Sequence, residues 1–286
     1  MSARPDISVI LATYNGADQL ECCTRSLMAT GDTNVEVLIA DDGSSNQRTF
    51  EIIEGFKKAA PFPVLHAWQE DIGFRLARSR NNAVKHASGE FLLFLDHDLL
   101  LPRTFFKTLR GTIRTGWFVG GRRVKLDTER SKRLLEGSME PRSLFSWKFA
   151  LQARRERLGG WRYLFPLRDR TPGTTPQPFR GMSGFCIGAW RKDFDAIDGF
   201  DDRYRGYGVE DWDFMARLNN AGVHAGYLPR AATVMHLWHK ETPHDLEGPG
   251  YQMLAEIENK GVTRAQIGYS SLNEEPATPA PQEATP

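Results

Sequence analysis

The sequence predicts an α/β protein built on a doubly wound, mostly parallel sheet flanked by helices. Three observations predict it: an unbroken apolar run that starts at Phe91, short β-branched runs that alternate with helical periodicity, and polar clusters that follow several of those runs. A strand without polar alternation is buried on both faces, as central parallel strands are. Strands that alternate with helices of this length indicate a parallel sheet.

The elements of the first hundred residues follow in order. A strand is expected from Ile7 to Ala12, and apolar residues at helical spacing come after it. A second strand runs from Val35 to Ala40 and precedes another helical stretch, and residues 64–68 form a short third strand. A basic helix from Arg75 to His86 then leads into the strand that begins at Phe91.

Between these elements and the last third of the chain lies a basic segment, residues 120–180. It carries fifteen Lys or Arg against six Asp or Glu, interleaved with aromatic residues, whereas the whole chain has a net charge of +1. Such a segment suits contact with an anionic membrane or an anionic glycan acceptor, or it is a solvated helical insertion with its own small core. Beyond it, we expect a helix that ends at Gly222 and a strand from Ala231 to Met235.

Length and composition bound the organisation of the chain. With 286 residues, we expect one domain over residues 1–265 that includes the insertion, and a disordered tail over residues 266–286. The near-zero net charge gives no reason to expect nucleic acid as a partner. Three cysteines without ligand or disulfide spacing fit a reducing compartment. No apolar run is long enough for a signal sequence or a membrane span, so we expect a cytoplasmic protein, at most peripheral on the inner face of the cell membrane.

Three of the predicted strands end in polar clusters: Thr13-Tyr14-Asn15, Asp41-Asp42 and Asp96-His97-Asp98. The carboxyl edge of an open α/β sheet is where ligands bind. An aromatic ring can stack on a base, a carboxylate can accept from a base or ribose, and two carboxylates one residue apart can hold a hard divalent cation. The set therefore fits a nucleotide with a diphosphate, although an Asp-rich turn alone would need no ligand.

The chain lacks a glycine-rich phosphate loop after its first strand. A metal and cationic side chains would have to hold the phosphates instead. Arg75, Arg78 and Arg80 are the candidates, and the alternative is that they form a solvated basic helix face.

The quoted motifs together resemble those of the inverting glycosyltransferases of family 2, which share the nucleotide-sugar-binding GT-A fold. The segments that carry the resemblance are ISVILATYNG, LIADDGSS, ARSRNNAVKHASGEFLLFLDHD, GFDDRYRGYGVEDWDFMARLNNAG and MHLWHK. The last two are also similar to β-1,4-galactosyltransferases and to bacterial chondroitin-type polymerases.

The resemblance implies roles for single residues at the donor site. Thr13, Tyr14 and the Asp41-Asp42 turn would hold the uracil and ribose of a UDP-sugar. Asp98 would bind Mn²⁺ or Mg²⁺ on the diphosphate, Asp96 would lie near the ribose or the metal, and Arg80 occupies a basic position beside the nucleotide.

Glu210 and Asp211 begin the helix that ends at Gly222, behind a tight turn with Gly206 and Gly208. Acids in a first helical turn already favour the helix dipole, so they need no further role. The resemblance implies instead that this element binds the acceptor sugar and that Asp211 deprotonates the attacking hydroxyl.

Two histidines three residues apart, His236 and His239, follow the last predicted strand. One such pair is more often plain surface or core histidine than a metal site. The resemblance implies that a histidine here completes the metal shell of Asp98. We expect His236 to be this ligand, with His239 as the second choice.

The resemblance thus implies a hexosyltransferase that moves a hexose or N-acetylhexosamine, by preference of galactose type, from a UDP-sugar to a cell-surface glycan or lipopolysaccharide. Two alternatives are a nucleotidyltransferase of related fold and a nucleotide-sugar-binding protein without catalysis. The first would need a glycine-rich loop where Thr13-Tyr14-Asn15-Gly16 stands, and the second would have lost metal or base residues that are present here.

Overall fold

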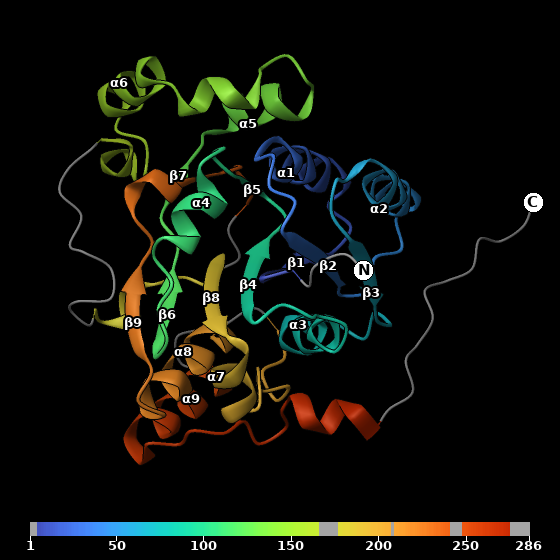
Figure 1. Cartoon of the computed structure of the whole chain (residues 1–286), viewed down its shortest axis with the longest axis vertical. Helices are drawn as coiled ribbons and strands as arrows, with labels where there is room; N and C mark the ends of the chain where they lie inside the picture. Colours follow the sequence, from blue (N-terminus) through green and yellow to red (C-terminus); the bar gives the residue numbers. More distant parts are fainter. Residues whose placement is uncertain (1–4, 166–176, 207–208, 241–247, 275–286) are drawn as a thin grey trace, which may run out of the picture.

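The computed structural model describes residues 5–165, 177–206, 209–240 and 248–274, and it confirms the predicted α/β fold. A seven-stranded sheet has the order β3-β2-β1-β4-β8-β6-β9 (Figure 1). The strands β3, β2, β1 and β4 are parallel, β8 is antiparallel to β4 and β6, and β9 is parallel to β6. The strands are β1 Ile7–Thr13, β2 Val35–Asp41, β3 Val64–Trp68, β4 Phe91–Asp96, β6 Trp117–Gly120, β8 Cys186–Trp190 and β9 His224–Tyr227.

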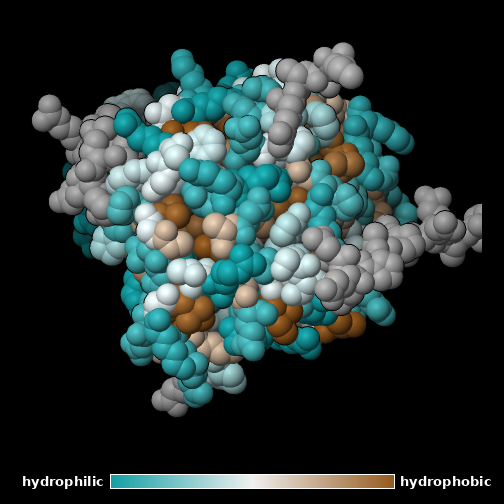
Figure 2. Space-filling view, turned by 60° about the horizontal axis from the view of Figure 1, so that its bottom comes forward, coloured by the Kyte–Doolittle hydropathy of each residue, from teal (hydrophilic) through white to brown (hydrophobic). Residues whose placement is uncertain are grey.

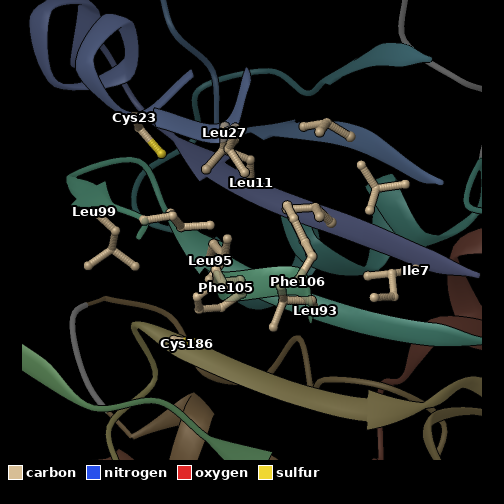
Figure 3. Close-up of a cluster of buried hydrophobic side chains, with 14 of the residues drawn as sticks. Ile7, Leu11, Cys23, Leu27, Leu93, Leu95, Leu99, Phe105, Phe106 and Cys186 are labelled. Carbon is tan, nitrogen blue, oxygen red and sulfur yellow. The ribbon is translucent and has the colours of Figure 1, made fainter. Parts of the chain in front are cut away.

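Helices cover both faces of this sheet, as a doubly wound topology requires. Along β1, Val9 and Leu11 belong to one apolar cluster with residues of α1 and α2, whereas Ile10 belongs to a second cluster with residues of α3. Figure 3 shows the first cluster, with Leu27 next to Leu11 and with Leu93 and Leu95 of β4 as further members. The helices are α1 Ala17–Ala29, α2 Gln47–Ala59, α3 Leu76–Val84, α4 Phe105–Arg110, α7 Arg191–Ala196, α8 Glu210–Asn220 and α9 Pro249–Lys260.

A second sheet of three short strands lies beside the first, in the order β5-β10-β7. Its strands are β5 Leu99–Leu100, β10 Val234–His236 and β7 Arg123–Lys125. The strand expected from Ala231 to Met235 is thus shorter, because a 3₁₀ turn, η4 Arg230–Ala232, occupies its first residues. This sheet brings the segment after the buried strand next to the segment that carries the two histidines.

The insertion leaves the sheet at β7 and stands above it in Figure 1. Its described part forms α5 Thr128–Leu135, η1 Pro141–Phe145, α6 Trp147–Glu156 and η2 Trp161–Leu164. A separate apolar cluster, with Leu126, Leu134 and Phe149 on the insertion side and Met235 on the sheet side, holds it in place. The insertion therefore has the small core that the sequence offered as one alternative, and residues 166–176 lie outside the described part.

The expectation that the chain is disordered from residue 266 is wrong for the residues that the structure describes there. Residues 266–274 were expected to be disordered, yet Tyr269–Glu274 form the 3₁₀ segment η5 and Leu272 is buried. Asp198 fixes this segment by accepting from the backbone N–H and the hydroxyl of Ser270, each at 2.8 Å. One apolar anchor and these hydrogen bonds suffice to order a polar segment, and residues 275–286 lie outside the described residues.

The surface seen in Figure 2 is mainly hydrophilic, with hydrophobic side chains in small groups between the polar ones. Cys22, Cys23 and Cys186 are buried free thiols. Among the described residues, no helix combines the length and the apolar character that crossing a membrane requires.

Candidate active site

The three polar clusters meet at one edge of the sheet, as the sequence predicts. Thr13 lies beside Asp41 in the register of β1 and β2, and Ala12 lies beside Asp96 in the register of β1 and β4. Since these strands are parallel neighbours, their carboxyl ends and the loops that follow open on the same side.

The first two loops are tied together by Asn15. Its backbone is left-handed, with φ of 48°, and its Oδ1 accepts from the backbone N–H groups of Ser45 at 2.9 Å and Asn46 at 2.8 Å. Asn15 is therefore a positioning residue for both loops. The neighbouring Tyr14 is half exposed, and its hydroxyl donates to Asp71 Oδ2 at 2.8 Å, so the ring is held at the surface of the edge.

Asp41 and Asp42, which the sequence treats as one nucleotide-binding turn, have different environments. Asp41 is fully buried and accepts from the Ser44 backbone N–H at 2.8 Å, while its other oxygen lies 2.9 Å from His66 Nε2. That carboxylate holds the loop, and its expected contact with the donor stays a prediction. Asp42 accepts from the Gln69 amide and the Arg75 backbone N–H, and burial raises its pKa to about 6.

Asp98 lies against both predicted histidines. Its Oδ2 is 3.3 Å from His236 Nε2 and 3.3 Å from His239 Nε2, and ligand atoms of the three residues lie within 4.8 Å of one another. The hydrogen bond from the Leu237 backbone N–H to the Asp98 carbonyl, 2.9 Å, fixes the two segments together. His236 is buried and His239 is exposed, and both reach the carboxylate. The preference for His236 as the metal ligand stays a prediction.

The donor set fits a divalent cation such as Mn²⁺ or Mg²⁺. Asp98 Oδ1 is buried without a hydrogen-bond partner among the described residues, and burial together with the Asp96 charge raises the Asp98 pKa to about 7. Burial and the charge of Arg123 lower the pKa of His236 to about 3, so its imidazole is neutral at pH 7. A neutral imidazole and a carboxylate that lacks a counter-charge are the forms that bind metal.

Arg80 joins the donor edge to the element that starts with Glu210. Its Nη2 lies 3.1 Å from Asp96 Oδ1, its Nη1 lies 3.6 Å from Glu210 Oε1, and its guanidinium stacks over Phe200 at 5.2 Å. The side chain is almost completely buried, and its Nε has no partner among the described residues. A buried cation between two carboxylates holds the two halves of the site at a defined separation.

Asp211 stands next to Glu210 at the amino terminus of α8. Burial raises the pKa of Asp211 to about 6, and burial with the Asp211 charge raises that of Glu210 to about 8. The Asp211 carboxylate packs against Gly184, where an added Cβ would lie 2.4 Å from Oδ2. The small residues of the GMSGFCIGAW segment thus leave space for this carboxylate.

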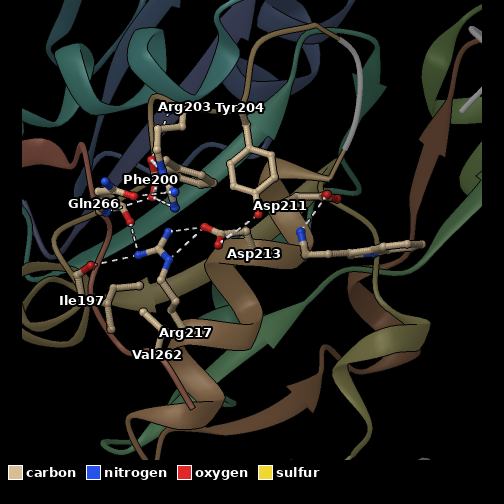
Figure 4. A network of polar contacts seen from close by, with 12 residues as sticks. Ile197, Phe200, Arg203, Tyr204, Asp211, Asp213, Arg217, Val262 and Gln266 are labelled. Atoms are coloured by element: carbon tan, nitrogen blue, oxygen red, sulfur yellow. Dashed lines mark hydrogen bonds and ion pairs between the residues drawn. The ribbon is translucent and has the colours of Figure 1, made fainter. Parts of the chain in front are cut away.

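A buried network anchors α8 beneath these acids (Figure 4). Arg217 binds Asp213 through its Nε at 2.8 Å and Nη2 at 2.6 Å, and donates to the carbonyls of Ile197 and Gly199, each at 2.8 Å. Tyr204 donates to the same Asp213 at 3.3 Å. These contacts hold α8 in place and thereby set the direction of Asp211. Gly208 of the expected glycine turn lies outside the described residues.

Arg75 and Arg78, the other two candidate cations, both pair with one carboxylate outside the site. Arg75 forms a close ion pair with Asp202, and Arg78 Nη1 lies 3.1 Å from the same carboxylate. This clamp ties α3 to the segment before α8. It leaves Arg80 as the candidate of the three that lies within the site.

Arg123 on β7 is a cation that the sequence reasoning missed. Its guanidinium stacks on the Phe185 ring at 4.5 Å, and that ring packs edge-on to His236 at 6.5 Å. Its charge opposes the rise of the Asp98 pKa and lowers the pKa of His236. Because Arg123 is one of many arginines in the basic insertion, the sequence gave no signal that it would lie close to Asp98 and His236.

Comparison with protein families gives two matches. The family described as "Glycosyl transferase family 2" matches residues 8–197, and the "N-terminal domain of galactosyltransferase" matches residues 174–240. Validoxylamine A glucosyltransferase of Streptomyces hygroscopicus subsp. jinggangensis is 33% identical over 98 residues, which are 34% of this chain and 22% of that protein. The chain covers about a fifth to a quarter of the length of the first curated relatives.

Solved structures share the fold at low sequence identity. The Staphylococcus aureus protein TarS, residues 1–349, in complex with UDP-GlcNAc has a TM-score of 0.58 at 17% identity, over 93% of this chain and 69% of that one. The mannosyltransferase PcManGT from Pyrobaculum calidifontis, in complex with GDP-Man and Mn²⁺, has a TM-score of 0.54 at 17% identity, over 97% and 67%.

Proposed function

Because this chain belongs to glycosyl transferase family 2, we propose that it transfers a hexose or N-acetylhexosamine from a UDP-sugar to a hydroxyl of a glycan or glycolipid, with inversion at the anomeric carbon. The observation that carries the proposal is the Arg80 bridge. It places the strand end with Asp96 and Asp98 opposite the helix start with Glu210 and Asp211. This arrangement supports a donor site and an acceptor base as parts of one site.

Donor binding uses the polar edge of the sheet. Tyr14 offers a half-exposed ring to the base, and Thr13, whose buried Oγ1 has no partner among the described residues, and Asp42 face the nucleoside. Asp98, His236 and His239 would hold Mn²⁺ or Mg²⁺, which supplies positive charge to the diphosphate when bound. Arg123 adds a cation on the same side, in a position to offset the charge of the leaving group.

The transfer needs a base because a sugar hydroxyl is a weak nucleophile. Asp211 takes the hydroxyl proton as the oxygen attacks C1 of the donor sugar, and the bond from C1 to the diphosphate oxygen breaks on the opposite face. The products are the glycoside with inverted configuration, UDP and a protonated Asp211. Glu210, whose raised pKa keeps it largely protonated at pH 7, can donate a hydrogen bond to the acceptor.

The identity of the donor rests on relatives. TarS is solved with UDP-GlcNAc, and the match to the galactosyltransferase domain over residues 174–240 supports a galactose-type hexose. The test is a calorimetric titration with UDP-glucose, UDP-galactose and their N-acetyl forms, each with Mn²⁺ and with a chelator. We expect one of them to bind only with the metal, and a protein that binds none of them would refute the proposal.

A further inference from the structure

A large cavity lies between α1 and the insertion, apart from the site described above. Its volume is about 1080 Å³, at the upper end of the range of about 300–1,000 Å³ for small-molecule sites. None of the described residues assigned to the donor, the metal or the acceptor lines it. Figure 1 shows the two elements between which it lies, α1 below and the helices of the insertion above.

The lining of this cavity is apolar. Leu101 after β5, Leu134 of α5, Leu144 of η1 and Ala150 of α6 contribute buried side chains, and Leu164 of η2 adds a partly buried one. A space lined in this way favours a hydrocarbon over water, because it offers water few hydrogen-bond partners. The five residues come from five separate segments, so the cavity is formed by the docking of the insertion on the sheet domain.

The charged side chains that line the same cavity are mainly cationic, four arginines against the one carboxylate of Glu140. Arg103 and Arg142 line it and are exposed, and neither has an acidic or hydrogen-bond partner among the described residues. By contrast Arg25, which also lines the cavity, is paired with Glu21. Residues 120–165 carry twelve Lys or Arg and five Asp or Glu, so the surrounding surface is positive as well.

The adjoining helix α6 exposes apolar side chains. Trp147 is 68% exposed and Leu151, one turn further, is 42% exposed. Lys148 and Arg155 are exposed on the same helix. Exposed Trp and Leu with basic neighbours are typical of a helix that lies in the headgroup region of an anionic membrane.

We propose that this cavity takes an acyl chain of a membrane lipid whose anionic phosphate headgroup is held by Arg103 and Arg142, so that α6 lies on the bilayer surface. The apolar volume accounts for the chain, the two unpaired guanidinium groups for the phosphate, and Trp147 with Leu151 for the contact with neighbouring lipids. Peripheral attachment of this kind goes beyond sugar transfer and does not depend on it.

Vesicle sedimentation with the full chain tests the headgroup contact. We expect binding to phosphatidylcholine vesicles that contain phosphatidylglycerol, weak binding to phosphatidylcholine alone, and a loss of at least about tenfold when Arg103→Glu and Arg142→Glu are combined. The matched control is Lys58→Glu with Arg114→Glu, two exposed residues away from the cavity that give the same change of charge. Equal losses in both double variants would overturn the headgroup site in favour of a general charge effect.

Acyl-chain entry has its own test. Wild-type protein should bind monomeric dodecyl phosphate and not inorganic phosphate, and Ala150→Phe, which fills the cavity without changing charge, should weaken that binding. Because Ala150 is buried, the melting temperature of its variant is compared with that of the wild type to show that the variant is folded. The combined surface variant Trp147→Ser and Leu151→Ser should reduce vesicle binding. Unchanged dodecyl phosphate affinity in a folded Ala150→Phe variant, or equal affinity for inorganic phosphate, would refute the cavity assignment.

Discussion

Two places in the site bury carboxylates, and they balance the charge in different ways. At the start of α8, Glu210 and Asp211 lie near the guanidinium of Arg80, which the protein itself supplies. At the end of β4, Asp98 lies against two histidines, of which His236 is neutral at pH 7, and one carboxylate oxygen has no partner among the described residues.

The difference indicates two kinds of chemistry. A carboxylate near a fixed cation, with a pKa raised only to about 6, is ionised at neutral pH and can still accept a proton from a substrate. The pKa of the buried Asp98 carboxyl is raised to about 7 despite the charge of Arg123, and a divalent cation would add the positive charge that stabilises its ionised form. The first place suits proton transfer and the second suits metal binding.

Removal of Asp98 should have the largest effect. Asp98→Ala deletes the one anionic member of the metal set, so we expect Mn²⁺-dependent UDP binding to disappear and transfer to fall by at least about a thousandfold. Calorimetry with UDP and Mn²⁺ measures the first and a UDP-release assay the second. Asp195→Ala, on α7 and away from the site, is the control, and wild-type metal-dependent affinity in Asp98→Ala would exclude the metal site.

Asp211→Asn should come next. The amide keeps the size of the side chain but cannot take the proton, so transfer should fall by at least about a hundredfold while UDP and Mn²⁺ bind as before. That split between binding and turnover separates the proton site from the metal site. If turnover is unchanged, Asp211 is not the base.

Arg123→Ala should weaken UDP binding by about ten- to a hundredfold, the usual range for a charge-assisted contact of about 1.5–3 kcal/mol. Arg123 lies beside the metal ligands, so the loss should persist at saturating Mn²⁺. Arg114→Ala is the control, since Arg114 is exposed and lies in the turn before β6. Equal UDP affinities in the two variants would remove Arg123 from the donor site.

The smallest effect is expected for pH. Burial raises the pKa of Asp211 to about 6, so below that pH its carboxyl is protonated and cannot act as base. The kcat/KM should therefore rise with pH and level off above about 6, with a loss of roughly tenfold for each unit below it. A kcat/KM that stays constant from pH 5 to 7 would contradict this prediction. The remaining activity of Asp211→Asn should not decrease below pH 6 in this way.

Local patterns in the sequence predicted much of the fold and the residue types of the site. The β-branched runs before Thr13 and Asp41 and the apolar run before Asp96 became adjacent parallel strands, so the three polar clusters were expected at one edge before any contact was known. Strand periodicity is local, and the rule that places ligands at the carboxyl edge follows from topology alone. The order of residues along helix α8 likewise placed Glu210 and Asp211 at its first turn.

Partners of single side chains could not be predicted in this way. Asp41 and Asp42 are buried neighbours in a turn, but Asp41 contacts Ser44 and His66 while Asp42 contacts Gln69 and Arg75. Arg75, Arg78 and Arg80 look equivalent in the sequence, yet Asp202, more than a hundred residues away, takes the first two. The ordered end of the chain depends in the same way on Asp198, far from it in the sequence.

The sequence by itself determined the alternation of strands and helices, the edge that carries the polar clusters and the kinds of group available there, because these depend on periodicity and on residue chemistry. Only the tertiary structure decided which carboxylate meets a cation and which meets two histidines, that Arg123 lies close to His236, and that the insertion leaves a cavity against α1. Charge compensation and burial depend on side chains that converge from distant segments, and no local pattern encodes that convergence.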